Sequence, residues 1–205
     1  MHPAHDRHRP YRRALTGRVR TASRDLVTRV GATVAAVALL VGLAGCTGGP
    51  TGSAPVFQMF APEDRQAAPT LTGDLVDGSG AYDPATHAGQ VLVINFWGSW
   101  CGPCLAEAPE LEAVRAAFQD QGLAFLGVSV RDNLDNARGF AAQYTSFPSI
   151  FDKSSKIALG FAVHPNAVPA TIVLDRQGRI AAVARSPLIR SDLEPVVVAL
   201  LEETG

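Results

Sequence analysis

Short apolar runs separated by turn residues predict six strands between residues 71 and 184. The predicted strands cover residues 71–76, 91–97, 123–130, 149–151, 170–174 and 180–184. The second and third are nearly continuous apolar runs, which are typical of strands buried on both faces of a central sheet. Asp77-Gly78-Ser79-Gly80 predicts a turn after the first strand, and residues 175–179 predict a hairpin between the last two.

Apolar residues at helical spacing predict four helices. They cover residues 102–121, 134–144, 154–161 and a C-terminal segment through Leu201. Pro109 should kink the first helix or end a first short segment, since proline cannot donate to the preceding turn. Asp132 is a candidate N-cap of the second helix, and Ser191-Asp192-Leu193-Glu194 is a capping box that opens the last. This order predicts an α/β fold with a central mixed β-sheet flanked by helices.

The first 45 residues have the pattern of a secretory signal peptide. Eight arginines and two aspartates lie within residues 1–29, and residues 30–44 carry no charge. An apolar segment of this length after a positive segment is typical of a signal peptide and is short for a membrane span. We expect residues 1–45 to lie outside the fold. The pair Arg12-Arg13 leaves the export route, general secretory or twin-arginine, open.

Leu43-Ala44-Gly45-Cys46 closes this segment and resembles the lipobox of bacterial lipoproteins. The resemblance implies that cleavage makes Cys46 the new N-terminus and that a lipid on it anchors the chain to the cell membrane, outside the cytosol. The alternative is a signal anchor that is never cut, with Cys46 as a small buried residue.

Residues 46–69 are rich in Gly, Pro, Thr, Ser and Ala and lack a sustained period. This composition predicts a flexible linker between the lipidated N-terminus and a domain over residues 70–205. A small apolar patch at Val56, Phe57, Met59 and Phe60 either docks as a short strand or stays mobile.

Composition and charge indicate a globular domain and restrict its partners and cofactors. With 205 residues and 47% hydrophobic content, the chain suits one globular domain with an appendage. A formal net charge of −1 argues against nucleic acid as a partner, because phosphate binding needs a basic face. The sequence contains no glycine-rich phosphate loop, and we expect no cofactor. Lipidation of Cys46 leaves one cysteine pair, Cys101 and Cys104, in a compartment that permits disulfides.

The candidate chemistry lies in Cys101-Gly102-Pro103-Cys104, directly after the strand 91–97. The spacing puts Cys101 at a helix N-terminus and Cys104 one turn inside. Free N–H groups and the positive end of the helix dipole stabilise a thiolate there and lower its pKa. We therefore expect Cys101 to attack and Cys104 to resolve, so that the pair cycles between dithiol and disulfide.

Zinc is the first alternative for a pair of cysteines at this spacing. A structural zinc site needs four ligands, however, and the sequence offers no second pair. His87 and His164 are isolated, Cys46 is assigned to the lipid, and the histidines of residues 2–8 lie in the predicted signal peptide. We expect no metal.

Several motifs in register resemble the thioredoxin superfamily over residues 70–203. They are Phe96-Trp97-x-x-Trp100-Cys101-Gly102-Pro103-Cys104, Val168-Pro169-Ala170-Thr171 and Ile172-Val173-Leu174-Asp175 followed by Gln177-Gly178. Within it, the chain is similar to the membrane-tethered TlpA/ResA/CcmG-like thiol-disulfide oxidoreductases. The resemblance implies a thioredoxin-like fold and a cis Pro169 against the cysteines, with a trans proline as the alternative. It also implies that substrate contacts Trp100, Gly102, Pro103, Val168 and Pro169.

Glu107 lies three residues after Cys104, on the same helix face, and matches an acidic residue that moves protons at the buried cysteine in the ResA-like branch. The alternative is a surface glutamate favoured by the helix dipole, the role we assign to Glu110 and Glu112. Asn95 stands where cytoplasmic thioredoxins have a buried aspartate. Because an amide cannot take a proton, Glu107, water or the partner must supply the acid–base help.

The resemblance implies a protein-disulfide reductase that acts on cysteine-containing proteins, with apocytochrome c as a substrate and a membrane thiol-disulfide protein as electron donor. Gly102-Pro103 between the cysteines resembles the reducing members. An oxidase that introduces disulfides remains an alternative, because direction depends on the relative stability of dithiol and disulfide. A peroxiredoxin-like peroxidase is another, although it needs an arginine and a hydroxyl around peroxide rather than an adjacent resolving thiol. The last alternative is a binding module with a structural disulfide.

Overall fold

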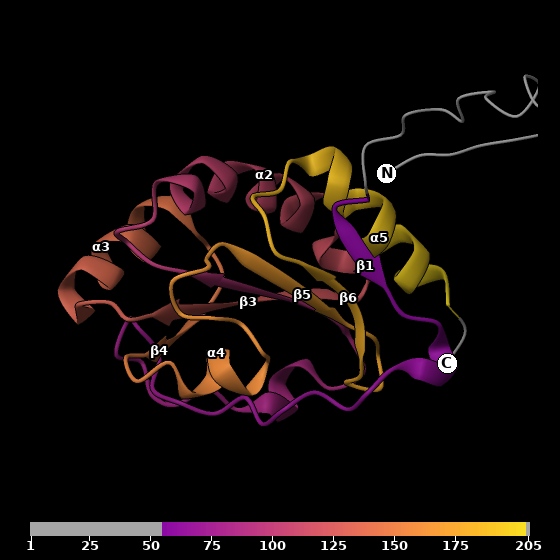
Figure 1. Ribbon diagram of the computed structural model, residues 1–205, viewed down its shortest axis with the longest axis horizontal. Coiled ribbons are helices and arrows are strands. Elements are labelled where there is room, and N and C mark those ends of the chain that lie inside the picture. The colour runs from indigo at the N-terminus through magenta and orange to yellow at the C-terminus, as the bar shows by residue number, and fades with distance from the viewer. Residues whose placement is uncertain (1–54, 204–205) are drawn as a thin grey trace, which may run out of the picture. The chain divides into compact units, whose positions relative to one another are not determined.

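A six-stranded mixed sheet organises residues 55–203, the part of the chain described by the computed structural model. Across the sheet the strands run β1-β6-β5-β2-β3-β4 (Figure 1). Their bounds are Phe57–Met59 for β1, Val91–Trp97 for β2, Leu123–Val130 for β3, Ser149–Asp152 for β4, Ala170–Leu174 for β5 and Ile180–Ala184 for β6. The predicted signal peptide and the predicted lipid site Cys46 lie outside the described residues.

The register of β2 brings the predicted site together. β2 is parallel to β3, and its last pair is Trp97 with Ser129. β2 is antiparallel to β5, and the pair Phe96 with Ala170 lies at the same end of the sheet. The carboxyl ends of β2 and β3 and the start of β5 therefore meet at one edge, directly before the two cysteines.

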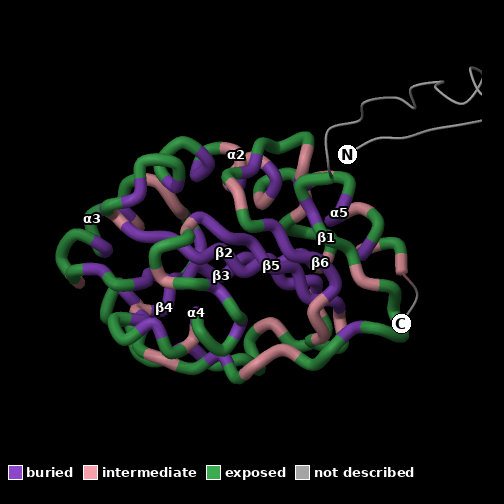
Figure 2. The backbone as a smooth tube through the Cα atoms, in the orientation of Figure 1, coloured by how far each residue is buried: buried purple, intermediate pink, exposed green. Residues whose placement is uncertain are grey.

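Helices cover both faces of the sheet. They are α2 (Gly102–Phe118), α3 (Leu134–Tyr144), α4 (Lys156–Gly160) and α5 (Arg190–Glu202). In Figure 1, α2 and α5 lie on one side of the sheet and α4 lies on the other. Val91 and Val93 pack under α2 and α5, while Leu92, Ile94 and Phe96 pack toward α4. This alternation is the two-residue period of a strand, and it buries β2 completely (Figure 2).

The predicted fold class is confirmed, and most predicted elements are found within a few residues of their bounds. The strand predicted over residues 71–76 is wrong. Only the isolated pairs Asp74 with Ala81 and Leu75 with Ile150 form, because the chain reverses at once through a tight turn. Leu71 and Val76 are nevertheless buried, so the apolar pattern of residues 71–76 indicated buried side chains and not a strand.

The helix ends also differ from the predictions. The α2 helix continues through Pro109, so the proline does not end a first segment. Asn133, not Asp132, caps α3 by accepting two backbone N–H groups. The α5 helix starts at Arg190, and Asp192 accepts the backbone N–H of Ile189 at 3.1 Å. The predicted box, with Ser191 as the cap, is therefore two residues too late.

The apolar patch near the N-terminal end docks onto the sheet. Phe57 in β1 pairs antiparallel with Ala184, and Phe57 is buried. Further along, Gln66 O accepts Ile180 N–H at 2.8 Å, and Ala68 N–H donates to Gly178 O at 3.0 Å. These contacts extend the domain to about residue 57, so the segment from there to residue 69, predicted as flexible linker, belongs to the fold. Within residues 55–203, no helix has the length and apolarity needed to cross a membrane.

Candidate active site

The two cysteines of the motif form a disulfide at the start of α2. The Sγ atoms are 2.03 Å apart. Cys101 is the N-cap residue, and its Sγ accepts the backbone N–H of Cys104 at 3.1 Å. Pro103 occupies one of the first helical positions, where its missing N–H costs no hydrogen bond. The predicted placement at a helix N-terminus is confirmed, with Cys101 4% and Cys104 1% exposed.

The loop before β5 lies against the disulfide. The Val168–Pro169 peptide bond is cis, as the resemblance implied. The Sγ of Cys101 lies 3.6 Å from the Val168 carbonyl oxygen. Residues 67 positions apart in sequence are thus brought together at the edge of the sheet.

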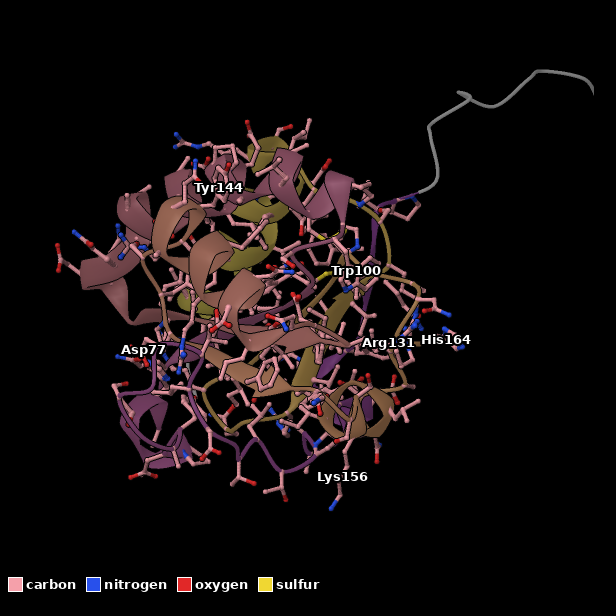
Figure 3. The ribbon with its side chains drawn as sticks, turned by 90° about the vertical axis from the view of Figure 1, so that its left-hand side faces the viewer. Asp77, Trp100, Arg131, Tyr144, Lys156 and His164 are labelled. Atoms are coloured by element: carbon pink, nitrogen blue, oxygen red, sulfur yellow. A yellow bond between two sulfur atoms is a disulfide. The ribbon has the colours of Figure 1, made fainter. Side chains whose placement is uncertain are left out.

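Trp100 forms the exposed wall of the site. Its side chain is 49% exposed, and its Nε1–H donates to Val130 O at 3.3 Å. The indole lies over Gly98, where a Cβ would come within 2.6 Å of Nε1. Figure 3 shows the sulfur atoms beside Trp100. Gly98 thus lets the indole fold onto the loop that precedes Cys101.

Asp132 holds the loop before Cys101 in place through hydrogen bonds to Ser99. Its carboxylate accepts the backbone N–H and the hydroxyl of Ser99, both at 2.6 Å, and the hydroxyl of Ser129 at 3.2 Å. The sequence predicted a helix cap for this residue. Within the sequence, only the position of Asp132 just after a buried strand could have indicated this anchoring role. Its partner Ser99 could not be recognised, because it lies 33 residues away.

Glu107 lies three residues after Cys104 in α2 and is buried, with 2% of the residue exposed. One carboxylate oxygen, Oε1, accepts from Asn95 Nδ2 at 2.8 Å, and Oε2 accepts the backbone N–H of Leu188 at 3.0 Å. Burial raises the pKa of Glu107 to about 7, although both hydrogen bonds act in the opposite direction. A carboxyl with this pKa can take and give a proton near neutral pH. The surface alternative for Glu107 is wrong.

The other two glutamates of α2 are less buried and hold neighbouring segments. Glu110 accepts the backbone N–H of Arg190 at 2.9 Å. Glu112 accepts the backbone N–H and the hydroxyl of Ser146 and pairs with Arg115. The sequence assigned both to a favourable position in the helix dipole, and it missed the contacts with Ser146 and Arg190 because these partners lie 34 and 80 residues further along the chain.

An open groove of about 610 Å³ runs from Cys101 between α2 and α3. Trp100, Leu105, Phe140 and Tyr144 give it apolar and aromatic walls, and Gly102 forms part of its floor. Such a groove suits an extended polypeptide segment next to a reacting cysteine.

The histidines considered as zinc ligands lie apart. His87 Nδ1 is 2.8 Å from the hydroxyl of Tyr82, and His164 Nδ1 accepts the backbone N–H of Asn166 at 3.2 Å. In the part of the chain that the structure describes, no group of three or more His, Cys, Asp or Glu side chains is placed to hold a metal ion.

Known proteins are similar to this chain in sequence and in architecture. Residues 65–183 match the model of the AhpC/TSA family. The thiol:disulfide interchange protein HelX of Rhodobacter capsulatus is 35% identical over 134 residues, which cover 62% of this chain and 72% of HelX. The thiol-disulfide oxidoreductase ResA of Geobacillus thermodenitrificans is 28% identical over 109 residues, so that the match spans 53% of this chain and 62% of ResA.

A solved structure gives the same result for the fold. A secreted thiol-disulfide isomerase from Corynebacterium glutamicum superposes with a TM-score of 0.68 at 31% identity, over 76% of this chain and 96% of that one. The resemblance to the thioredoxin superfamily and to ResA-like proteins is confirmed. The chain belongs to the AhpC/TSA family of thioredoxin-like proteins, and the relatives it matches are thiol-disulfide oxidoreductases and interchange proteins.

Proposed function

We propose that this protein is an extracytoplasmic thiol-disulfide oxidoreductase that reduces disulfides in other proteins. The observation that carries the proposal is the pair Cys101–Cys104 at the N-terminus of α2, with the buried Glu107 three residues after Cys104 on the same helix. Few other chemistries need two adjacent cysteines and a proton acceptor in one site.

The reaction starts from the reduced enzyme. Cys101, as thiolate, attacks one sulfur of a partner disulfide, and the other partner sulfur leaves as a thiolate that takes up a proton. Cys104 then loses its proton to Glu107 and attacks the Cys101 sulfur. The second partner sulfur leaves, and the enzyme holds the disulfide seen here. Two electrons have passed from the enzyme dithiol to the partner disulfide.

The division of labour between the cysteines follows from their surroundings. The Sγ of Cys101 accepts the Cys104 N–H and borders the open groove, whereas Cys104 is almost completely buried. A thiolate at Cys101 is stabilised by the helix N-terminus and can meet a partner. Cys104 can reach only the sulfur of Cys101.

The groove favours cysteine-containing proteins as substrates. The exposed Trp100 and Leu105 offer apolar contacts on one side of Cys101, and the Val168 carbonyl offers a backbone acceptor on the other. Apocytochrome c is the substrate that the ResA-like branch implies, and a membrane thiol-disulfide protein is the implied electron donor. We propose that a lipid on Cys46 keeps the domain at the membrane surface, with residues 1–45 removed.

The test of function is turnover of a disulfide-containing peptide by the reduced protein, together with its reduction potential. A reductase has a low potential, near or below about −270 mV as in thioredoxin, and Cys101→Ser abolishes turnover. A potential near about −120 mV would make the protein an oxidase instead. Rapid consumption of hydrogen peroxide with a reductant would favour the peroxidase alternative.

The membrane anchor has its own test. Mass spectrometry of protein from a bacterial membrane fraction should find a diacylglycerol-modified Cys46 at the N-terminus. Cys46→Ser should release the domain from the membrane or block its processing. An unmodified chain that keeps residues 1–45 would support the uncut signal anchor.

A further inference from the structure

Both carboxylate oxygens of Glu107 face hydrogen-bond donors. Oε1 faces the amide Nδ2 of Asn95, and Oε2 faces the backbone N–H of Leu188. This arrangement suits the ionised carboxylate, which only accepts. A protonated carboxyl must donate its proton, and neither an amide NH₂ nor a backbone N–H can accept it. Protonation of Glu107 therefore requires one of the two partners to change.

Asn95 is able to change. Its Nδ2 donates to Glu107 Oε1 at 2.8 Å and to Thr171 Oγ at 3.2 Å. A half-turn of the amide places Oδ1 where Nδ2 now lies. That oxygen has two lone pairs, so it can accept the Glu107 O–H and the Thr171 O–H together. The hydroxyl of Thr171 fits both orientations, because it can accept or donate.

Leu188 is not free to change in the same way. Its N–H belongs to the backbone between β6 and α5, and the residue is buried. The next turn is held as well, since Arg190 N–H donates to Glu110. Loss of the Leu188 bond would leave a buried N–H without a partner, which costs more than the rotation of an amide.

We propose that Asn95 is a positioning residue that turns its amide over whenever Glu107 gains or loses a proton, so that the carboxyl stays in place in both states. The inference rests on the proposed function, in which Glu107 exchanges a proton with Cys104. An aspartate at this position could not donate to ionised Glu107, and an aliphatic residue could neither donate nor accept.

The groups near Glu107 do not explain a pH-dependent change at Asn95 in place of Glu107 itself. Asn95 on β2 and Thr171 on β5 are neutral. On α2, Cys104 is held in the disulfide and Glu110 points to Arg190 N–H, while Asp192 on α5 accepts from Ile189 N–H. In the oxidised protein, titration of Glu107 can therefore be followed without a titrating thiol beside it.

The experiment is an NMR titration of the oxidised full domain between pH 5 and pH 9. The carboxyl carbon of Glu107, the side-chain NH₂ of Asn95 and the backbone N–H of Leu188 are followed. We expect the Asn95 signals to shift with the same midpoint as the Glu107 carbon, while Leu188 N–H stays protected from exchange. Unmoved Asn95 signals with loss of Leu188 protection would overturn the proposal.

Variants separate positioning from structure. Asn95→Asp, which removes the donor to ionised Glu107 and puts a second carboxyl beside it, should raise the titration midpoint of the pair. A midpoint that stays in place would mean that Asn95 does not act on Glu107. Thr171→Val should reduce the Asn95 shift, and Thr171→Ser should restore it. Glu112→Gln on the same helix, whose carboxylate contacts Ser146 and not the segment around Leu188, is the matched control and should leave all three signals unchanged.

Failure of the amide rotation and failure of the proposed function give different results. Titration of Asn95 with Glu107 in a protein that fails to reduce a peptide disulfide would overturn the function and keep the amide rotation. Normal turnover with unmoved Asn95 signals would overturn the rotation and keep the function.

Discussion

The guanidinium of Arg65 lies inside the protein, where its Nη1 contacts Asp175 Oδ2 at 3.2 Å across 110 residues of sequence. The same group donates to both carboxylate oxygens of Glu203, at 2.6 and 2.7 Å. Such two-point bonds between guanidinium and carboxylate are stronger than neutral ones. The pairings tie the segment after β1, the β5–β6 hairpin and the end of α5 together at the pole opposite the cysteines.

Removal of Arg65 should therefore destabilise the domain strongly. In Arg65→Met the buried Asp175 loses one ion-pair partner and keeps Arg179, and the free energy of unfolding should fall by about 2–4 kcal/mol. Urea denaturation measures the loss. The control is Arg190→Ala, which removes an exposed pair with Glu194 that solvent screens, so its loss of stability should be small. Equal losses in the two variants would contradict the structural role of Arg65.

Replacement of Gly98 should displace Trp100. In Gly98→Ala the new Cβ would lie 2.6 Å from the indole Nε1, too close for any side chain, so the ring must leave the loop and lose its bond to Val130 O. We expect a red shift of tryptophan fluorescence, since the indole becomes more exposed. Gly139→Ala on α3, where a Cβ has no neighbour within 4 Å, is the control and should leave the spectrum unchanged.

The sequence predicted those elements whose signal is local. The strands β2 and β3 were found at their predicted bounds because burial on both faces leaves a continuous apolar run. The docking of residues 57–69 could not be predicted in the same way. Its buried member Arg65 finds partners more than a hundred residues away, and residues 57–69 show no sustained strand or helix period.

The predictions for the site divide in the same way, between features with a local signal in the sequence and contacts made only by the tertiary fold. The cysteine pair, the cis peptide bond at Pro169 and the choice of Glu107 over Glu110 and Glu112 as the candidate acid were expected from motifs in the sequence. The contacts that hold these groups were not, because Leu188 N–H and the Asp132 carboxylate reach them only through the tertiary fold. The pairing of Asn95 with Thr171 depends on the register between β2 and β5, which a single sequence leaves undetermined.

Asp132 should be needed as a carboxylate. Four donors point at it, namely both groups of Ser99, the hydroxyl of Ser129 and the backbone N–H of Asn133. In Asp132→Asn one amide NH₂ must face a donor, so the free energy of unfolding should fall by about 1–3 kcal/mol in a denaturation experiment. Asp135→Asn, at an exposed position with a 3.7 Å contact to Arg138, should cost less than about 0.5 kcal/mol. A loss no larger than this in Asp132→Asn would refute the anchoring role.

Removal of the resolving thiol should trap the partner. Cys104→Ala leaves Cys101 beside the groove, so a mixed disulfide with a substrate forms and cannot be released within the enzyme. Non-reducing electrophoresis and mass spectrometry of the adduct detect it. Cys101→Ala is the matched control and should form no adduct, because Cys104 does not line the groove. Equal adducts from both variants would contradict the assignment of the attacking cysteine.

Glu107 should make the stability of the oxidised protein fall as pH rises. Burial raises its pKa from 4.5 to about 7, so the folded state holds this proton more tightly than the unfolded chain does. The cost of ionising the buried carboxyl is absent below about pH 4.5, grows as pH increases, and is complete above about pH 7. On this basis the cost is on the order of 3 kcal/mol.

Glu107→Gln cannot ionise and should lose this dependence. Relative to wild type, its free energy of unfolding should rise by about 2–3 kcal/mol between pH 4.5 and pH 8, as measured by urea denaturation of the oxidised proteins at both pH values. Glu110→Gln, whose carboxylate is less buried and one turn further along α2, should follow the wild-type curve. A difference between Glu107→Gln and wild type that is constant over this range would mean that folding leaves the pKa of Glu107 near 4.5. Its carboxylate would then be a much weaker base for the Cys104 thiol than we propose.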